Sequence, residues 1–386
     1  MLNTKEFTFQ AESKHLEATI KKAGSVLSVS GSESGGNNFF MVSHKKKLQV
    51  VGLNNEALVI ITVPDANVSG DGAFGFATET ILGLIKGRAA MNFEFNLHEL
   101  SFKQLKGKYT GKLVTLPISS DQQSSSEAML NSGSKTDSVL TLPNDLLAQL
   151  KAGVQLTSVK DVFQGTSLLS YISLKDGMLT VASLDNHHFG RFCLPVDPKI
   201  KDFRVCLPSS HFGIINNIAA EEDAKFYIST GKIRVEGKTF SIVLPATQSK
   251  EEHFFMVDKL ISTLTKPAFQ GKCSTEDLLK VVDNLFTLFS ANTSMLLEST
   301  KDNKAIKIGF NSNSGSASDT IAIESKSAKA FKANVEPRLM KDITTLAAQS
   351  SKLATFRLFD NVVTLYTKSG DAELVYGSSR VGNNGN

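Results

Sequence analysis

Side chains able to carry out catalysis are few in this chain, and their spacing does not assemble a site. His187 and His188 are the only adjacent histidines, and neighbours on a strand point to opposite faces, which makes them a poor metal chelate. The three cysteines, Cys193, Cys206 and Cys273, lack metal-ligand spacing. Neither a GxxxxGK[ST] phosphate loop nor a GxSxG nucleophile elbow occurs. We therefore predict no catalytic residues, no metal and no cofactor.

Basic side chains are the second group with a chemical use, because they can hold a polyanion. The 42 Lys and Arg residues barely exceed the 38 Asp and Glu residues, so the net charge of +4 permits a polyanionic partner without requiring one. The run Lys45-Lys46-Lys47 lies at the edge of an expected hairpin, where it is more typical of a solvated strand start than of a binding patch. Contact with a polyanion remains the alternative for this run.

The chain has the features of a cytoplasmic protein. An odd number of dispersed cysteines argues against a disulfide framework and suits a reducing compartment. No apolar run approaches the roughly 18 residues that a membrane helix needs. The first residues lack the basic and then apolar profile of a secretion signal. We predict a cytoplasmic location without membrane association, in the host cytoplasm if the protein is phage-encoded.

One strand pattern occurs three times, at intervals of about 130 residues. An alternating strand that opens on Phe, a tight turn, a second strand and a final apolar strand occupy 93–117, 226–245 and 356–376. A repeat of this length corresponds to a whole domain. We predict three domains at 1–120, 139–250 and 251–386, with 121–138 as a flexible serine-rich linker.

Each predicted domain has two amphipathic helices, with a hairpin between them. Leu16, Ile20 and Ala23 recur at helical spacing in the first helix. The other helices are expected at 78–86, 144–151, 209–219, 275–289 and 338–347. The hairpins are expected around 54–55, 176–177 and 301–303. The predicted fold class is α+β, with two helices packed on a mostly antiparallel sheet in each of three repeated domains.

Three similar domains in one chain suggest a closed assembly with quasi-symmetry. If two chains associate head to tail, each forms a half-ring, and six domains can enclose a hole with their helices turned inward. Such a ring holds duplex DNA by topology, so it needs weak phosphate contacts and no base recognition.

The residues also resemble a known family, the bacterial-type sliding clamps, which are processivity subunits of replicative DNA polymerases. The segment Thr180 to Phe189 stands where that family has Ala-Thr-Asp-Gly-His-Arg-Leu, with Asp185 and His187 matching. The ending Val114 to Pro117 is similar to the Thr-Leu-Pro closure of the family's first domain. The resemblance covers nearly the whole chain. The C-terminus departs from the family, because Gly377-Ser378-Ser379-Arg380 replaces its Met-Pro-Met-Arg-Leu ending.

The resemblance implies partners and a pocket. The partners are duplex DNA bound without sequence preference, a second copy of the chain, and a DNA polymerase and a clamp loader bound through short peptides. The implied peptide pocket lies between the second and third domains, lined by Leu169, Leu184, His187, His188, Phe189, Pro245, Leu374, Val375 and Tyr376. For Leu169, Leu184 and Phe189, an ordinary place in the core is the alternative.

Two further sets of residues follow from the clamp hypothesis. The DNA-facing side chains are expected to be Lys14, Lys21, Lys22, Lys86, Arg88, Lys151, Arg338 and Lys341. For each lysine alone, a solvated helix face is the alternative. The edge strand 109–116 is expected to pair with the third domain of a second chain. The residues predicted at this interface are Tyr109, Leu113, Phe286, Leu288 and Phe289.

Two other functions compete with the clamp. A non-catalytic multidomain scaffold or phage structural protein would use the same domains for protein contacts alone. An enzyme with an unrecognised site is the third possibility. The divergence from the family, including the slightly basic net charge, suits a phage-encoded clamp with its own loader and polymerase.

Overall fold

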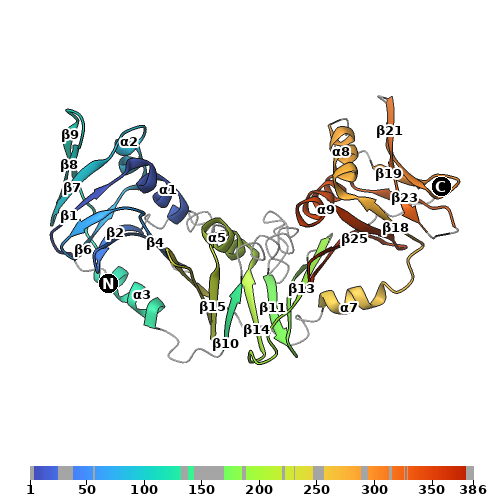
Figure 1. Ribbon diagram of the computed structural model, residues 1–386, viewed down its shortest axis with the longest axis horizontal. Coiled ribbons are helices and arrows are strands. Elements are labelled where there is room, and N and C mark those ends of the chain that lie inside the picture. Colours follow the sequence, from blue (N-terminus) through green and yellow to red (C-terminus); the bar gives the residue numbers. More distant parts are fainter. Residues whose placement is uncertain are drawn as a thin grey trace. The chain divides into compact units, whose positions relative to one another are not determined.

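The computed structural model describes residues 4–24, 38–54, 57–131, 138–142, 169–184, 188–219, 222–229, 231–246, 256–287, 294–312, 315–325, 327 and 329–379. The chain forms two compact units. Unit 1 comprises Met1–Leu147 and Gly213–Thr247, and unit 2 comprises Ala148–Phe212 and Gln248–Asn386. All strand pairs between the described strands are antiparallel (Figure 1), which confirms the predicted α+β class.

Unit 1 contains two sheets. The five-stranded sheet has the order β5 (Asn67–Ser69), β1 (Phe7–Ala11), β7 (Met91–Asn96), β8 (Glu99–Gln104), β9 (Thr110–Val114). The eight-stranded sheet has the order β10 (Ser138–Leu142), β15 (Ala224–Ser229), β16 (Lys232–Glu236), β17 (Phe240–Pro245), β4 (Leu58–Thr62), β3 (Lys47–Leu53), β2 (Asn38–His44), β6 (Gly72–Phe76). Its helices are α1 (Ser13–Gly24), α2 (Thr78–Ile85) and α3 (Ser120–Asn131), and α5 (Ser209–Ala219) carries the chain into it.

The core of unit 1 is rich in phenylalanine, and β7 contributes two of these rings from a strictly alternating strand. In β7, Met91, Phe93 and Phe95 are buried while the residues between them are exposed. The rings of Phe9 and Phe93 stack at 4.6 Å, and those of Phe74 and Phe95 at 4.7 Å. Such ring pairs add specificity to the area that they bury.

Unit 2 also contains two sheets. The nine-stranded sheet has the order β14 (Phe203–Pro208), β11 (Leu169–Lys175), β12 (Met178–Leu184), β13 (His188–Pro195), β26 (Ala372–Ser379), β25 (Val362–Ser369), β24 (Leu353–Leu358), β18 (Phe269–Ser274), β22 (Glu324–Ser325). The four-stranded sheet has the order β21 (Gly315–Ala322), β20 (Ala305–Ser312), β19 (Met295–Ser299), β23 (Lys332–Val335). Its helices are α7 (Met256–Thr263), α8 (Thr275–Phe286) and α9 (Pro337–Ser350).

Two helices of unit 2 begin at residues that favour a helix start. Ser274 caps α8 by accepting a hydrogen bond from the Asp277 backbone N–H at 3.2 Å, and Pro337 occupies the first turn of α9. At the other end of α9, the buried hydroxyls of Ser350 and Tyr376 are hydrogen-bonded at 2.6 Å. This contact ties the end of the helix to β26.

The repeat is visible as two kinds of three-stranded meander. The first kind is β2-β3-β4, β11-β12-β13 and β19-β20-β21, and the second is β7-β8-β9, β15-β16-β17 and β24-β25-β26. In unit 1, β17 pairs with β4, and in unit 2, β26 pairs with β13. We call each of these two strand pairings a joint. A joint links the third strand of a meander of the second kind to the third strand of a meander of the first kind.

This sharing of sheets explains why the two units do not coincide with three domains. The strands of the predicted domain 139–250 divide between the two units: β10 and β15 to β17 join the eight-stranded sheet, and β11 to β14 join the nine-stranded sheet. The predicted boundaries therefore stay a prediction. The expected helix at 144–151 lies outside the described residues.

The serine-rich segment differs from the flexible linker that we expected, because it contains helix α3. Ser119 and Gln122 form a reciprocal capping box: the Gln122 N–H donates to Ser119 Oγ at 3.2 Å, and the Ser119 N–H donates to Gln122 Oε1 at 2.8 Å. Met129 and Leu130 then pack on the buried cluster around Phe40 and Val243. A cap and two apolar contacts outweigh the poor helix propensity of serine.

Candidate functional site

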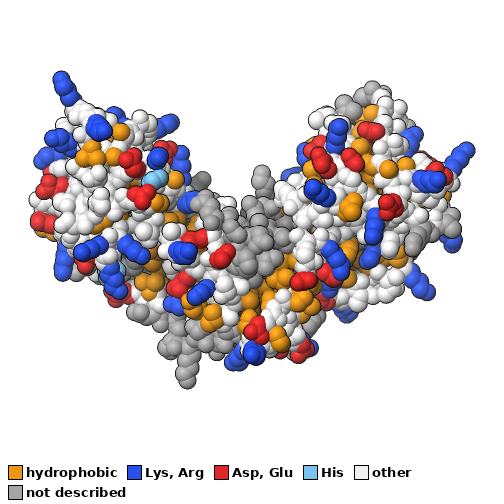
Figure 2. Space-filling view, in the orientation of Figure 1, with side chains coloured by type: hydrophobic (Ala, Val, Ile, Leu, Met, Phe, Trp, Pro, Cys, Tyr) orange, Lys and Arg blue, Asp and Glu red, His pale blue; other side chains and the backbone are white. Residues whose placement is uncertain are grey.

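The helix layer of unit 1 is basic, as the clamp hypothesis requires. Residues 13–24 and 78–88, which span α1 and α2, contain five basic and two acidic side chains. Lys14, Lys21 and Lys86 are exposed, and Lys22 is half-buried. Lys21 forms an ion pair with Glu17 one turn earlier at 2.6 Å. Figure 2 shows many Lys and Arg side chains on the visible face of unit 1, with Asp and Glu among them.

Arg88 is engaged by an aromatic ring. Its guanidinium carbon lies 3.4 Å from the centre of the Tyr109 ring, and its Nε donates to the Leu84 carbonyl at 2.7 Å. This cation–π contact connects the end of α2 to the residue before β9. The predicted DNA-facing Arg88 and the predicted interface residue Tyr109 are thus in direct contact.

The helix layer of unit 2 carries more acidic than basic side chains. α8 and α9 hold three basic and four acidic residues. Arg338 is exposed, whereas Lys341 forms an ion pair with Asp283 at 3.1 Å and lies 4.5 Å from the centre of the Phe286 ring. Lys151 lies outside the described residues. Electrostatic attraction of DNA by described helices would therefore come mainly from unit 1.

Several predicted pocket residues meet in one apolar cluster, which we name the α7 cluster. Its buried members are Ala182, Phe189, Val257 and Val375. Its partly buried members are Leu184, Leu260, Ile261, Leu264, Val362 and Tyr366. Phe189 on β13 is paired directly with Gly377 on β26. A Cβ at position 377 would come within 2.0 Å of the Phe189 ring, so a larger residue there would force that ring to move.

The other predicted pocket residues lie elsewhere or cannot be placed. Leu374 and Tyr376 are fully buried, and Tyr376 faces α9 through its bond to Ser350. His188 is buried, with Nε2 3.9 Å from Asp342 Oδ2. Pro245 ends β17 in unit 1, and Leu169 begins β11. His187 lies outside the described residues. Leu184, Phe189 and Val375 are the members that come together.

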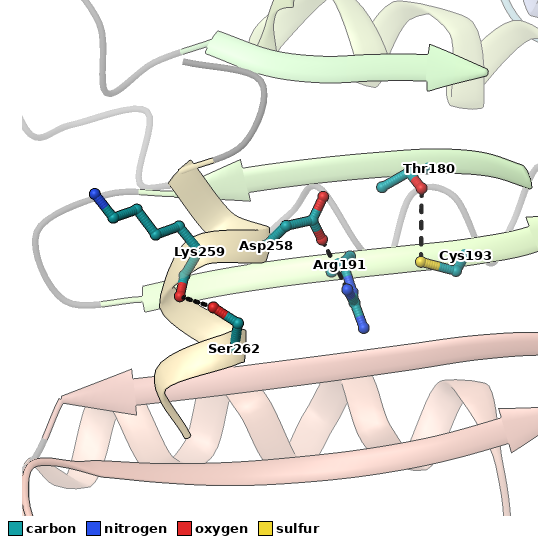
Figure 3. A network of polar contacts seen from close by, with 6 residues as sticks. All are labelled: Thr180, Arg191, Cys193, Asp258, Lys259 and Ser262. Atoms are coloured by element: carbon teal, nitrogen blue, oxygen red, sulfur yellow. Dashed lines mark hydrogen bonds and ion pairs between the residues drawn. The ribbon is translucent and has the colours of Figure 1, made fainter. Parts of the chain in front are cut away.

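Helix α7 is fixed to the sheet by a polar contact beside this cluster. Arg191 Nη1 donates to Asp258 Oδ1 at 2.7 Å, and Figure 3 shows the two side chains meeting between β13 and α7. Next to it, Thr180 Oγ1 and Cys193 Sγ lie 3.7 Å apart. Burial raises the pKa of the Cys193 thiol, and the Arg191 charge offsets part of that rise. Cys193 is therefore a neutral, packed thiol at neutral pH.

Sequence reasoning missed the contribution of α7. Val257, Leu260, Ile261 and Leu264 follow the i, i+3, i+4, i+7 pattern of an amphipathic helix, and all four contact the cluster. The pattern is present in the sequence, but it follows the short charged connection 246–252. The two helices predicted for each repeat do not include one at this place.

Two of the outer strands are third strands of meanders that pair with no further strand among those described. β9 ends the five-stranded sheet, and β21 ends the four-stranded sheet. Val114 on β9 is 89% exposed, and six of the eight residues of β21 are exposed. Leu113 and Phe286 are half-buried, whereas Leu288 and Phe289 lie outside the described residues. Open edges of this length invite pairing with another chain.

Features of other site classes are absent from the described parts of the chain. No group of three His, Cys, Asp or Glu residues there could hold a metal ion. No helix in those ranges is long and apolar enough to cross a membrane. The segment 70–75 has the spacing GxGxxG, but it forms a turn and strand β6 rather than the start of a helix. It therefore lacks the helix N-terminus that binds a pyrophosphate.

The comparisons with known proteins assign the fold. Solved structures match over nearly the full length of both chains. The beta subunit of DNA polymerase from Streptococcus pyogenes has a TM-score of 0.79 and 15% identity, and covers 97% of this chain and 99% of its own. The sliding clamp of Pseudomonas aeruginosa bound to griselimycin has a TM-score of 0.77 and 12% identity, with 98% and 100% covered. The Bacillus subtilis DNA polymerase sliding clamp has a TM-score of 0.76 and 11% identity, with the same coverage.

No family model and no curated protein matches the sequence. At 11–15% identity, the structural matches establish the fold and leave function to be argued from the site. The chain has the fold of the DNA polymerase III beta subunits, as the resemblance predicted.

Proposed function

We propose that the protein is a DNA sliding clamp, a non-catalytic processivity factor that encircles duplex DNA as a head-to-tail dimer and tethers a replicative polymerase. The observation that carries this proposal is the pattern of the joints. Within one chain, third strands pair twice, as β17 with β4 and β26 with β13. In both pairs, the third strand of a second-kind meander pairs with the third strand of a first-kind meander. The same pairing between two chains would bring β9 of one chain beside β21 of another.

The positions of the strands support that third joint. β4, β13 and β21 begin at residues 58, 188 and 315, and β9, β17 and β26 begin at 110, 240 and 372. β9 and β21 are thus the remaining members of the two strand sets, and both are sheet edges. If chains associate head to tail through this joint, any incomplete assembly has an unpaired β9 at one end and an unpaired β21 at the other. Both strands are paired in every chain only when the ring closes.

Two features of the surface support the tasks of a clamp. The basic α1 and α2 of unit 1 can hold phosphates by charge without reading bases. The partly exposed members of the α7 cluster, Leu184, Val362 and Tyr366, offer an apolar surface for a short peptide from a polymerase or clamp loader. The proposed site of action is the cytoplasm, in a phage-infected host if the gene belongs to a phage.

The test measures the mass of the assembly in solution and its retention on circular and linear DNA. Light scattering at micromolar protein should give twice the chain mass of 41.7 kDa. After loading, the protein should be retained on nicked circular DNA and released when that DNA is linearised. A stable monomer, or equal retention on both DNA forms, would favour the competing function, a scaffold that makes protein contacts alone.

A further inference from the structure

The turn between β2 and β3 presents four basic or titratable side chains together. His44 and Lys47 form the closing pair of the hairpin, and Lys45 and Lys46 form its two-residue turn. All four are exposed, and within the described part of the chain none of their side chains makes a hydrogen bond or an ion pair. We name residues 44–47 the lysine turn.

The backbone of the lysine turn is strained for its sequence. Lys45 has φ 50° and Lys46 has φ 61°, so both lie in the left-handed region. A two-residue turn of this hand is normally built from Asn-Gly or Asp-Gly, because other side chains crowd the backbone there. Two consecutive lysines in this conformation, between a facing His and Lys, combine an unfavourable backbone with clustered positive charge.

The repeat supplies two internal comparisons. The equivalent turn of β11-β12 is Asp176-Gly177, with φ 50° and 73°, which is the favoured chemistry. In the equivalent turn of β19-β20, Asp302 accepts hydrogen bonds from Thr300 Oγ1 at 2.7 Å and from the Lys304 backbone N–H at 3.1 Å, and the left-handed residue is Asn303. Only the lysine turn, of these three, lacks a residue suited to its conformation.

Two hydrogen bonds anchor the lysine turn and the neighbouring Ser43 to residues 70 and 71. The Lys45 backbone N–H donates to Asp71 Oδ1 at 3.2 Å, and the Ser43 hydroxyl donates to the Gly70 carbonyl. Both strands of the hairpin are paired on their outer sides, β2 with β6 and β3 with β4. The charged side chains therefore extend from a hairpin that has no open edge for an added strand.

We propose that the lysine turn is a binding site for the phosphate backbone of a nucleic acid, separate from the helices α1 and α2. A peptide partner would use a strand edge or an apolar surface, and this turn offers neither. Lysines on flexible stems suit phosphates bound without sequence preference. The inference goes beyond the proposed clamp, because a ring that holds DNA by topology needs no such contact.

The test uses the full chain and a variant that restores the favoured turn chemistry. The double variant Lys45→Asn/Lys46→Gly should melt at a higher temperature than the natural chain, because it relieves the left-handed strain. It should also bind a labelled single-stranded DNA of about 20 nucleotides more weakly. Between about 50 and 200 mM salt, the slope of log Kd against log salt should fall by about 1.4, the value for two lost phosphate contacts on a single strand.

Two matched variants separate charge from turn geometry and from position. Lys45→Arg/Lys46→Arg keeps the charge and should keep the affinity. Lys301→Gln/Lys304→Gln removes the same charge from the equivalent hairpin of β19-β20 and should leave the affinity within twofold of the natural chain.

Three results would overturn the proposal. The first is a stabilised Asn-Gly variant with unchanged DNA affinity, and the second is an equal loss in the Lys301/Lys304 control. The third is displacement of the oligonucleotide by polyglutamate as effectively as by unlabelled DNA, which would reassign the turn to an acidic protein surface. None of these results depends on the mass of the assembly, so the clamp proposal is tested separately.

Discussion

Ring closure through β9 can be tested by removing a single backbone N–H group from this strand. In the ladder between β8 and β9, the Gln104 N–H donates to the Tyr109 carbonyl and the Thr115 N–H to the His98 carbonyl. Backbone groups alternate in direction along an antiparallel strand, so Tyr109, Gly111, Leu113 and Thr115 face β8. Lys112 therefore directs its N–H to the open edge. Lys112→Pro should remove a hydrogen bond donor from the joint while it leaves the β8–β9 ladder intact.

The size of the effect follows from the joint seen in unit 1. β17 and β4 are paired over four residues, from Phe240 opposite Ile61 to Val243 opposite Leu58. A joint of that length has few backbone hydrogen bonds, each worth about 1 kcal/mol net, and the proline ring adds a steric cost. We expect a loss of about 1–3 kcal/mol at each joint. A two-joint ring would lose about 2–6 kcal/mol and would then dissociate about 30-fold to 20,000-fold more readily, since every 1.4 kcal/mol is a factor of ten.

The assay is sedimentation or light scattering across a dilution series, with Lys112→Ala as the matched control. The alanine variant also loses the exposed ion pair from Lys112 Nζ to Glu99, at 2.8 Å, but it keeps the backbone N–H. We expect Lys112→Ala to assemble like the natural chain and Lys112→Pro to shift to 41.7 kDa at the same concentration. A proline variant that keeps the native melting temperature and the dimer mass at all dilutions would refute the pairing of β9.

Two further predictions concern unit 2. Burial raises the pKa of the Cys273 thiol from 9.0 to about 12, so between these pH values the folded chain binds more protons than the unfolded chain. The contribution of Cys273 to stability should be complete below pH 9 and should fall by up to about 1.4 kcal/mol per pH unit above it. In urea unfolding, the free energy of unfolding of Cys273→Ala should fall less steeply above pH 9 than that of the natural chain. The same slope in both proteins would contradict the raised pKa of Cys273. Separately, Asp258→Asn removes the partner of Arg191 and should speed amide exchange in α7 about fivefold, the effect of about 1 kcal/mol. Ser262→Ala, which loses only a contact to the Lys259 carbonyl within α7, is the control (Figure 3), and equal exchange in both variants would show that the ion pair does not hold the helix.

The repeated elements could be predicted from the sequence because their patterns are local. Helix α5 has the predicted bounds, and α9 extends the predicted 338–347 only to Pro337 and Ser350. Helix α8 begins at Thr275 as predicted and ends at Phe286, three residues earlier than expected. The alternation of Phe93 and Phe95 with exposed residues fixed β7 in the same way. In each case, the local periodicity of apolar residues agrees with the final packing, and Ser274 also caps α8.

Helix α3 could not be predicted from a local pattern, because tertiary contacts stabilise it. α3 has four serines and weak amphipathicity, and it is helical because Met129 and Leu130 find an apolar surface supplied by β2, β3, β4 and β17. The Met129 carbonyl also accepts a hydrogen bond from Lys232 Nζ at 2.6 Å, 103 residues away in the sequence. Contacts across that separation leave no trace in a local window of residues.

The sheets show why a sequence repeat and a folded unit need not share boundaries. A repeat marks the stretch of chain that was copied, whereas a unit is defined by strands that pair. Here each copy gives one meander to the sheet before it and one to the sheet after it, as β15-β16-β17 and β11-β12-β13 do. A chain built in this way has one unmatched meander at each end, β7-β8-β9 and β19-β20-β21, whatever the number of copies. In the clamp proposal, β9 and β21 of these meanders pair between chains, and closure of a ring satisfies both edges without open-ended polymerisation.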